Sequence, residues 1–267
     1  MDNKEIRKLI EKDPELKAMK ISDYELLTAY RYLRLKQSND NPNYIPKLKR
    51  NGELEIVMMP TENFDKEIQR RAQRQNLGTI DTANYILDAK LADFVLNSDE
   101  RKEAYLKVSR FIDLFKEGKA SKGLYLYGRY GTGKTYLLSA IAEEVSRDKK
   151  VLFIYFPDLV RTMKSSIATN ELEANVTALK TCDLLIFDDV GSENMTAWFR
   201  DEILAPILQF RLASSLPLLI SSNFSQRELF EFMASSRNDV DMMKSTRIVH
   251  RIRELTEEVS LTIPYQG

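Results

Sequence analysis

Residues 128–135, GRYGTGKT, match the phosphate-loop pattern G-x-x-x-x-G-K-[ST] at every fixed position. The apolar run 123–127 before them predicts a strand, and residues 136–145 after them have the spacing of an amphipathic helix. Strand, glycine-rich loop and helix in this order form the setting in which the motif binds phosphate. A plain glycine-rich turn is the alternative explanation, and the flanking strand and helix argue against it.

The residue types of this loop predict a site for ATP and Mg²⁺. Glycines let successive backbone N–H groups converge on phosphate oxygens, and the N-terminus of the following helix adds its positive dipole end. We expect Lys134 to reach the β- and γ-phosphates, and the Thr135 hydroxyl to bind Mg²⁺. The expected nucleotide-binding residues are Gly128, Arg129, Tyr130, Gly131, Thr132, Gly133, Lys134, Thr135 and Tyr136.

The rest of the C-terminal part alternates between helical and strand patterns. Further strands are predicted at residues 151–156, 183–187, 216–221 and 259–263, and two helices are predicted between residues 88 and 115. Strands this apolar, separated by helices, are typical of a parallel sheet that is covered on both faces. The predicted fold class is therefore α/β, with a three-layer nucleotide-binding core over residues 88–267.

Residues 1–60 have the pattern of a small, mainly helical N-terminal domain. Ser22 and Glu25 have the spacing of a capping box, and Asn51-Gly52 lies between two runs that favour strands, which predicts a hairpin. Residues 61–87 are polar, and residues 69–76 among them are basic without apolar periodicity, which predicts a linker. A solvated helix is the alternative for this segment.

Bulk composition narrows the partners and the compartment. Lysine and arginine (40) balance aspartate and glutamate (40), so any DNA contact must come from local basic patches. No apolar run approaches the ~20 residues needed to cross a bilayer, and the N-terminus lacks a signal-peptide pattern, so we expect a cytoplasmic protein without a membrane partner. With one cysteine, Cys182, and one histidine, His250, no Cys/His zinc site is expected, and Cys182 is expected to pack in the core.

Two acids and an amide follow predicted strands. Asp188 and Asp189 come directly after the apolar residues 184–187, so they are expected at the sheet edge where the phosphate loop also lies. Asp188 would hold Mg²⁺ opposite Thr135, and Asp189 would orient the attacking water. Asn223 ends another strand and could hydrogen-bond the γ-phosphate or that water. An acidic turn and a turn-forming asparagine are the alternatives, which the complete phosphate loop disfavours.

Arg247 and Arg251 lie four residues apart, on one face of a predicted helix. Two cations on one face favour an anion, either the phosphate of a neighbouring subunit's ATP or a nucleic-acid strand. Pairing with Glu254, Glu257 or Glu258 is the alternative. An arginine donated by a neighbouring subunit would make hydrolysis depend on assembly.

The order GLYLYGxxGTGKT, LLIFDD, WFRDEILAPILQFR and LPLLISSNF resembles the bacterial DnaI and DnaC-like family of replicative helicase loaders, which are AAA+ ATPases. The resemblance extends from about residue 90 to about residue 260, and WFRDE at 198–202 is specific to DnaI-like proteins. It implies that Arg251 is the arginine finger with Arg247 as its neighbour, and that Asn223 is the sensor asparagine. No second sensor arginine follows Arg253, so a full helical lid domain is not expected.

The family resemblance also implies a function. Such proteins bind the hexameric replicative helicase through the N-terminal domain, assemble on it with ATP, and help to place it around single-stranded DNA during primosome assembly at replication initiation. Other primosome proteins are further possible partners. Many relatives hold zinc in the N-terminal domain, whereas this chain has no cysteine before Cys182. Asp188-Asp189 follows the family and suits a slow, switch-like hydrolysis.

Three other functions share part of this pattern: a transposition-type (IstB-like) DNA-binding ATPase, a nucleotide-gated adaptor with little hydrolysis, and a small-molecule kinase. The N-terminal domain and the WFRDE segment argue against the first, and the Asn223 strand end argues against the kinase. DNA contact is assigned to Phe156, Arg161 and Lys164, where related ATPases face a central channel. A helix with a solvated basic edge is the alternative for these three residues.

Overall fold

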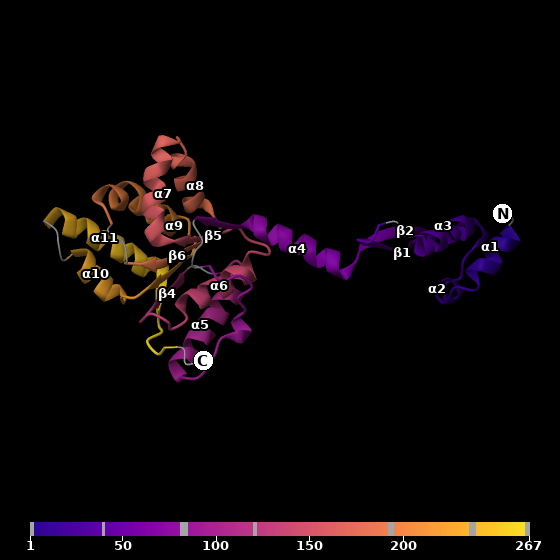
Figure 1. The fold of residues 1–267 in the computed structure, drawn as a ribbon, viewed down its shortest axis with the longest axis horizontal. Coiled ribbons are helices and arrows are strands. Elements are labelled where there is room, and N and C mark those ends of the chain that lie inside the picture. Colours follow the sequence, from indigo (N-terminus) through magenta and orange to yellow (C-terminus); the bar gives the residue numbers. More distant parts are fainter. Residues whose placement is uncertain are drawn as a thin grey trace. The chain divides into compact units, whose positions relative to one another are not determined.

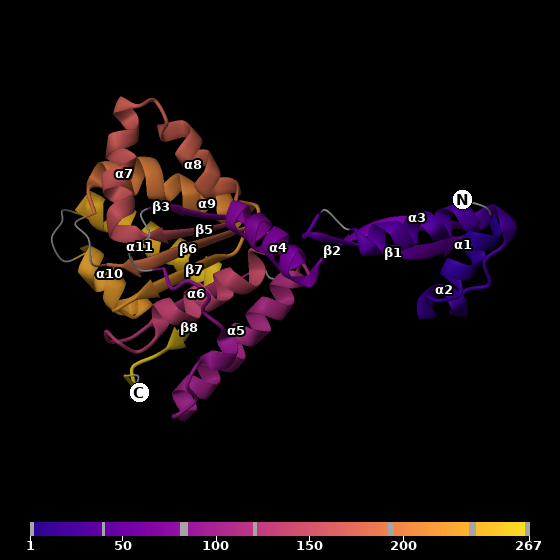
Figure 2. The same ribbon diagram turned by 45° about the vertical axis from the view of Figure 1, so that its right-hand side comes forward.

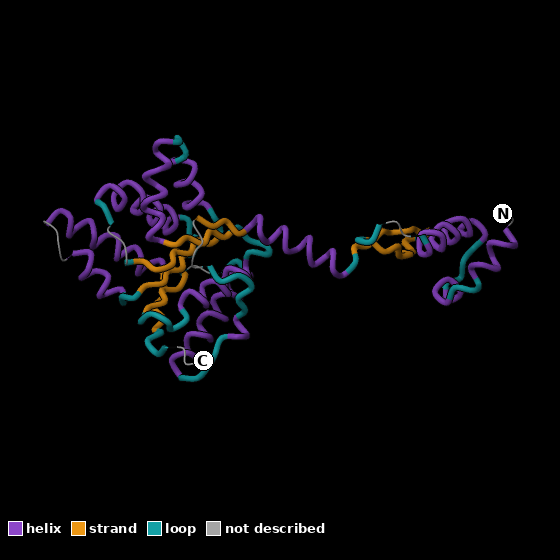
Figure 3. Tube along the Cα trace, viewed as in Figure 1, coloured by secondary structure: helices purple, strands orange, loops and turns teal. Residues whose placement is uncertain are grey.

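The computed structural model describes residues 3–38, 41–80, 85–119, 122–191, 195–234 and 239–264. The chain forms two compact units, which divide between Arg71 and Ala72. Figure 3 distinguishes their helices, strands and loops. None of the described helices combines the length and apolarity needed to cross a bilayer.

The first unit packs helices against a two-stranded hairpin. Its elements are α1 (Asn3–Ile10), α2 (Pro14–Ala18), α3 (Leu26–Gln37), β1 (Tyr44–Asn51), β2 (Glu53–Pro60) and the first part of α4 (Glu62–Asn76). The predicted hairpin is confirmed: β1 and β2 are antiparallel, and Gly52 at the tip has a φ of +81°, which glycine adopts without steric cost.

A small apolar core and polar caps hold this unit together. Its buried apolar side chains are Ile6, Ile10, Leu16, Leu26, Ala29, Tyr32, Leu33 and Leu54. The predicted capping box of Ser22 and Glu25 is confirmed: the Glu25 carboxylate accepts hydrogen bonds from the Ser22 amide (3.0 Å) and hydroxyl (2.6 Å). Burial of these side chains allows the unit to form a core of its own.

The segment predicted as a linker is largely regular. Helix α4 forms without an apolar stripe because ion pairs and hydrogen bonds at i,i+4 spacing support it: Lys66 with Glu62, Arg71 with Glu67, and Gln69 with Asp65. It continues into β3 (Leu77–Ile80), which pairs in parallel with β5 and was not predicted. Exposed polar pairs therefore supply a helix where apolar periodicity is missing.

The second unit is built on a parallel sheet of six described strands, which confirms the predicted α/β class (Figure 1). The strands are β3, β4 (Gly123–Tyr127), β5 (Val151–Tyr155), β6 (Leu184–Val190), β7 (Leu218–Ser222) and β8 (Thr256–Ser260), in the order β3-β5-β6-β7-β4-β8. Strand β8 begins three residues before the predicted 259–263. Strand β6 runs past Phe187, so that both acids lie within the strand rather than after it.

Helices cover both faces of the sheet, as Figure 2 shows. Helices α5 (Asp99–Lys116) and α6 (Lys134–Val145) pack on one face, and α7 (Phe156–Ala168), α8 (Leu172–Thr181), α9 (Ala205–Ala213), α10 (Gln226–Ala234) and α11 (Asp239–Leu255) contribute to the core of the other. Along β4, Leu124 and Leu126 face the first group and Tyr125 the second. The prediction of two helices between residues 88 and 115 is wrong: α5 is preceded by a 3₁₀ turn, Leu91–Asp93.

The assignment of Phe156 to DNA contact is wrong. Its ring is 1% exposed and packs edge-on against Phe187 (5.0 Å between centroids) and Phe199 (5.8 Å), so no base can stack on it. Arg161 and Lys164 on the same helix are exposed, and Arg161 pairs with Asp158 at 2.8 Å. The prediction that Cys182 packs in the core is confirmed, and His250 is exposed.

Replacing Phe156 with alanine should lower the free energy of unfolding by about 3–5 kcal/mol, because it leaves a cavity between α7 and the sheet. Ile167→Ala on the same helix is the control: that side chain is 55% exposed, and its loss should change stability by no more than about 0.5 kcal/mol. Urea unfolding measures both variants. Equal effects of the two substitutions would contradict the buried position of Phe156.

Candidate nucleotide-binding site

The phosphate loop connects β4 to α6, and glycine is required in it. Gly128 has a φ of +147°, and a Cβ there would lie 1.9 Å from the carbonyl oxygen of Leu261. Gly133, directly before α6, has a φ of +98°. A side chain at either position would be strained, so the loop keeps a bare backbone that can approach phosphate oxygens closely.

Lys134, the first residue of α6, lies at the centre of the loop. Its ammonium donates to the carbonyl oxygens of Gly128 (2.8 Å) and Arg129 (2.9 Å) and to Oδ1 of Asn223 (3.2 Å). Burial lowers the pKa of Lys134, and the carboxylates of Asp189 and Asp188 oppose this shift. The ammonium is thus held at the pocket by weak neutral acceptors, which a phosphate anion can replace.

Asp188 lies opposite the loop and is fully buried. Its carboxylate accepts from the Thr135 hydroxyl (3.0 Å) and from the Ser221 hydroxyl (2.5 Å). Burial raises the pKa of Asp188 above its ordinary 3.8, and these two hydrogen bonds oppose the shift. A carboxylate beside a hydroxyl is an oxygen donor set that suits Mg²⁺.

Asp189 adopts an unusual backbone conformation beside Asp188. Its φ is +64°, and the pairing of β6 with β7 shifts register between Phe187 and Val190. Its amide donates to Ser221 Oγ (2.9 Å), and its carboxylate accepts from Asn223 Nδ2 (3.3 Å) and Tyr155 Oη (3.5 Å). The irregular strand end turns this second carboxylate out of the regular alternation of the strand and into the pocket.

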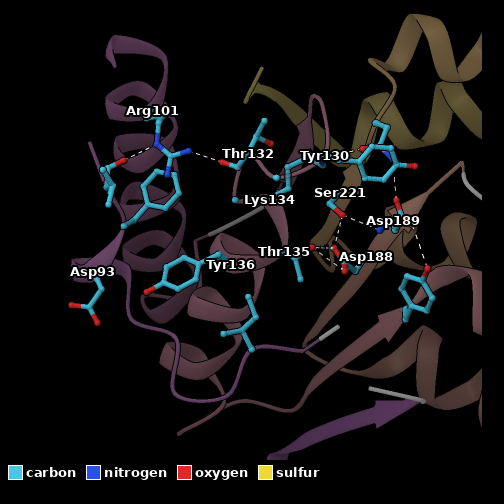
Figure 4. Close-up of a pocket in the computed structure, with 17 residues that line it drawn as sticks. Asp93, Arg101, Tyr130, Thr132, Lys134, Thr135, Tyr136, Asp188, Asp189 and Ser221 are labelled. Atoms are coloured by element: carbon cyan, nitrogen blue, oxygen red, sulfur yellow. Dashed lines mark hydrogen bonds between the residues drawn. The ribbon is translucent and has the colours of Figure 1, made fainter. Parts of the chain in front are cut away.

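These residues line one side of a cavity of about 640 Å³, a size that suits a nucleotide. Figure 4 shows Asp188, Asp189 and Ser221 on that side, and Asp93, Arg101 and Tyr136 across the cavity. The lining also includes the apolar residues Ile86, Phe94 and Val95, and the last two contact Arg101. The cavity thus combines a polar phosphate end with an aromatic and apolar end that can take a base.

Comparison with known proteins identifies the family. A model of the bacterial DnaA ATPase domain matches residues 88–243. The replicative helicase loader DnaI of Bacillus subtilis (strain 168) is 30% identical over 277 residues, which cover 98% of this chain and 88% of that protein. This chain belongs to the DnaI family of replicative helicase loaders.

Solved structures agree with the family assignment. A crystal structure of DnaI, 36% identical, matches 71% of this chain and 100% of its own with a TM-score of 0.64. The DnaC helicase loader matches 66% of this chain and 98% of its own at 23% identity and a TM-score of 0.52, which shows a shared fold. The DnaI-family chain therefore has an AAA+ core, and the matched DnaA domain is an ATPase.

The structure brings most of the predicted residues of this DnaI-family chain together. Those that line the cavity are Tyr130, Gly131, Thr132, Gly133, Lys134, Thr135, Tyr136, Asp188, Asp189 and Asn223. Arg247 and Arg251 are not among the described lining residues: both lie on α11, where Arg247 is exposed and Arg251 donates to the carbonyl oxygen of Ala205 (3.3 Å). Any role for these two arginines must therefore involve something other than this cavity.

Sequence reasoning missed Arg101, Ser221 and Tyr155. Arg101 on α5 is 1% exposed; it donates to the carbonyl oxygens of Thr132 and Val95, both at 2.6 Å, and lies 4.0 Å from the centroid of the Phe94 ring. It thereby ties the phosphate loop to the apolar wall. No sequence motif marks Arg101. Ser221 could have been predicted, because it carries a hydroxyl at the end of the strand next to the one that holds Asp188 and Asp189.

Asp188→Asn should raise the stability of the ligand-free chain near pH 7. Because burial raises the folded-state pKa of Asp188, the folded chain binds a proton more readily than the unfolded chain. The stability of the parent chain therefore falls as pH rises from 3.8 through the folded-state pKa, and asparagine removes this dependence. Thermal unfolding of the parent chain and the variant from pH 3.5 to 8 measures the difference in their stability. A parent chain that loses no stability relative to the variant over this range would contradict the buried charge.

Proposed function

We propose that this chain is an ATP-dependent loader of the replicative DNA helicase in the initiation of DNA replication. The observation that carries the proposal is the similarity to DnaI over 98% of the chain, which includes the N-terminal unit as well as the ATPase core. A transposition-type ATPase or a pure adaptor is not favoured by that full-length similarity. The activity belongs to the cytoplasm, where the chromosome is replicated.

ATP binding follows from the loop and its neighbours. The backbone amides of residues 128–136 would surround the phosphates, and Lys134 would exchange its carbonyl acceptors for β- and γ-phosphate oxygens. Thr135 and Asp188 would hold Mg²⁺, which neutralises phosphate charge. The apolar wall at Phe94 and Val95 would cover the base.

Hydrolysis is the slower step in this proposal. Asp189 orients the attacking water, and Asn223, which bonds both Asp189 and Lys134, senses the γ-phosphate. An aspartate has a shorter reach than a glutamate, which suits slow turnover. Arg251, with Arg247 beside it, completes the site of a neighbouring copy, so hydrolysis becomes fast only in the assembly.

The N-terminal unit is assigned to the helicase. Residues 1–60 form the helicase-binding domain, residues 61–87 connect it to the ATPase domain and add β3 and Ile86 to that domain, and residues 88–267 bind ATP and self-assemble on the helicase. The domain needs no zinc in this proposal, because its apolar core and caps hold the hairpin. The exposed cations Arg161 and Lys164 are assigned to single-stranded DNA. Other primosome proteins are further candidate partners.

The full chain should co-elute with the hexameric replicative helicase of its own organism in size-exclusion chromatography with light scattering when ATP is present. Lys134→Ala should weaken ATP binding by about 10–100-fold, because a charge-assisted bond to phosphate is lost, and should reduce the ATP-dependent part of this assembly. Lys102→Ala, on the exposed side of α5, is the control. No complex with or without ATP would overturn the loader proposal, and DNA-dependent filaments would then support the transposition-type function.

Arg251→Ala should leave ATP affinity unchanged and lower the ATP turnover of the assembled complex by about 10³-fold, the size of effect that arginine fingers have. The reason is geometric: Arg251 does not line the cavity of its own copy. Phosphate release measured with and without helicase separates basal from stimulated hydrolysis. Normal turnover of this variant in the assembled complex would show that Arg251 is not the finger.

A further inference from the structure

The WFRDE segment contains an unusual helical turn that binds two cations. Residues Phe199–Leu204 form a π-helix, a conformation that is rare and often marks a functional site. Within it, Asp201 accepts from Nε (2.6 Å) and Nη2 (3.0 Å) of Arg200, whose side chain is fully buried. The hydrogen bonds from Arg200 lower the pKa of Asp201 to about 2, so it is ionised under all ordinary conditions.

The second cation comes from the helix that carries the two arginines. Lys244 on α11 donates to Oδ2 of Asp201 at 2.7 Å. Lys244, Arg247 and Arg251 follow one another at spacings of three and four, so they share one flank of α11. The neighbouring stripe of α11 is buried in the core, through residues such as Ser245, Ile248 and Ile252. The cationic flank thus borders the contact between α11 and the rest of the core.

A second attachment lies on the same flank. Arg251 Nη1 donates to the carbonyl oxygen of Ala205, the residue that directly follows the π-helical turn. Lys244 and Arg251 are two helical turns apart, which is about 10 Å along the axis. Two polar attachments at this distance fix the rotation of α11 about its axis and its position along that axis. Apolar packing alone is less directional and would allow small shifts.

We propose that Asp201 is a positioning residue for the finger helix: through Lys244 it holds α11 in the orientation that presents Arg251 to the nucleotide of a neighbouring copy. The inference rests on the proposed function of Arg251. In the isolated chain Arg251 is held at Ala205, and on assembly it exchanges this carbonyl for phosphate while the link between Lys244 and Asp201 persists. The π-helical turn and the residue that follows it carry the two acceptors, the Asp201 carboxylate and the Ala205 carbonyl.

If the pair of Lys244 and Asp201 positions α11, its loss should affect the rate of hydrolysis more than the stability of the fold. The ion pair is partly exposed, with Lys244 46% and Asp201 23% accessible, and such pairs add little to global stability. Catalysis is more sensitive, because a displacement of about 1 Å in a reacting group can cost about 10²-fold in rate. Loss of the pair should therefore reduce stimulated turnover more than it reduces stability.

Lys244→Gln is the variant that tests this, because it removes the half-exposed partner and leaves the buried Arg200 with its carboxylate. In the complex with helicase, kcat for ATP should fall about tenfold while KM and the melting temperature stay unchanged, and Lys244→Arg should restore most of the rate. The matched control is Lys102→Gln, which removes a 2.9 Å ion pair with Asp99 on α5. Basal hydrolysis by the isolated chain should be the same for all of these variants.

Assemblies that mix two variants show whether Lys244→Gln impairs the nucleotide site of its own copy or that of the neighbouring copy. Copies with Asp189→Asn bind ATP and keep Arg251 but hydrolyse poorly, so in a mixture they should restore turnover at the sites of Lys244→Gln copies. Lys244→Gln turnover equal to that of Lys102→Gln would overturn the positioning role while Arg251→Ala remained defective. If Arg251→Ala itself turned over normally, the failure would lie in the finger assignment and hence in the proposed function.

Discussion

A buried carboxylate governs the arrangement of the whole nucleotide site. Asp188 is fully removed from solvent, and an isolated charge in such a position is costly. The hydroxyl groups of Thr135 and Ser221 and the nearby Lys134 ammonium offset part of that cost. In the proposed function, a divalent cation bound with its nucleotide would offset more of that cost, so the site would gain most in stability when it binds the ligand. Binding and the local stability of the sheet edge are therefore linked.

The strand order makes this carboxylate possible. Strand β7 lies between β6 and β4, so Ser221 and Asn223 come between the acids of β6 and the loop that leaves β4. The hydrogen bonds from Ser221 to Asp188 and from Asn223 to Asp189 could not form if β6 paired directly with β4. The crossovers that place β7 in the middle also put helices on both faces, which buries the four central strands β5, β6, β7 and β4 and excludes water from the carboxylate. The chemistry of the site thus depends on the topology of the sheet.

The sequence predicted those parts of the site that follow from local pattern. The phosphate loop, Asp188, Asp189 and Asn223 were found because each lies at the end of an apolar run, and parallel strands bring such ends to one edge. Arg101 was missed because its role depends on packing between α5, the loop and Phe94, which no spacing reveals. Phe156 was wrongly assigned because an aromatic residue at a strand end is as compatible with a core as with a stacking surface. Helix α4 is supported by polar pairs and by the packing of Phe64 on Tyr44 rather than by an apolar stripe, so no apolar period marked it.

In the proposed function, ATP binding and stimulated hydrolysis depend on different parts of the ATPase unit. The cavity assigned to the nucleotide is lined within one copy, by described residues of the phosphate loop, β6, the end of β7 and the wall at Phe94. The arginines assigned to hydrolysis in the proposal are instead on the flank of α11, outside that cavity; on this flank Lys244 binds Asp201 of the WFRDE segment, and Arg251 binds the carbonyl oxygen of Ala205. Under the proposed function, such a chain would bind ATP alone but would turn it over rapidly only beside a second copy. If Arg251 completes the site of a neighbouring copy, as proposed, the WFRDE segment would serve that contact between copies through Asp201 and Lys244, although it lies far from the phosphate loop in sequence.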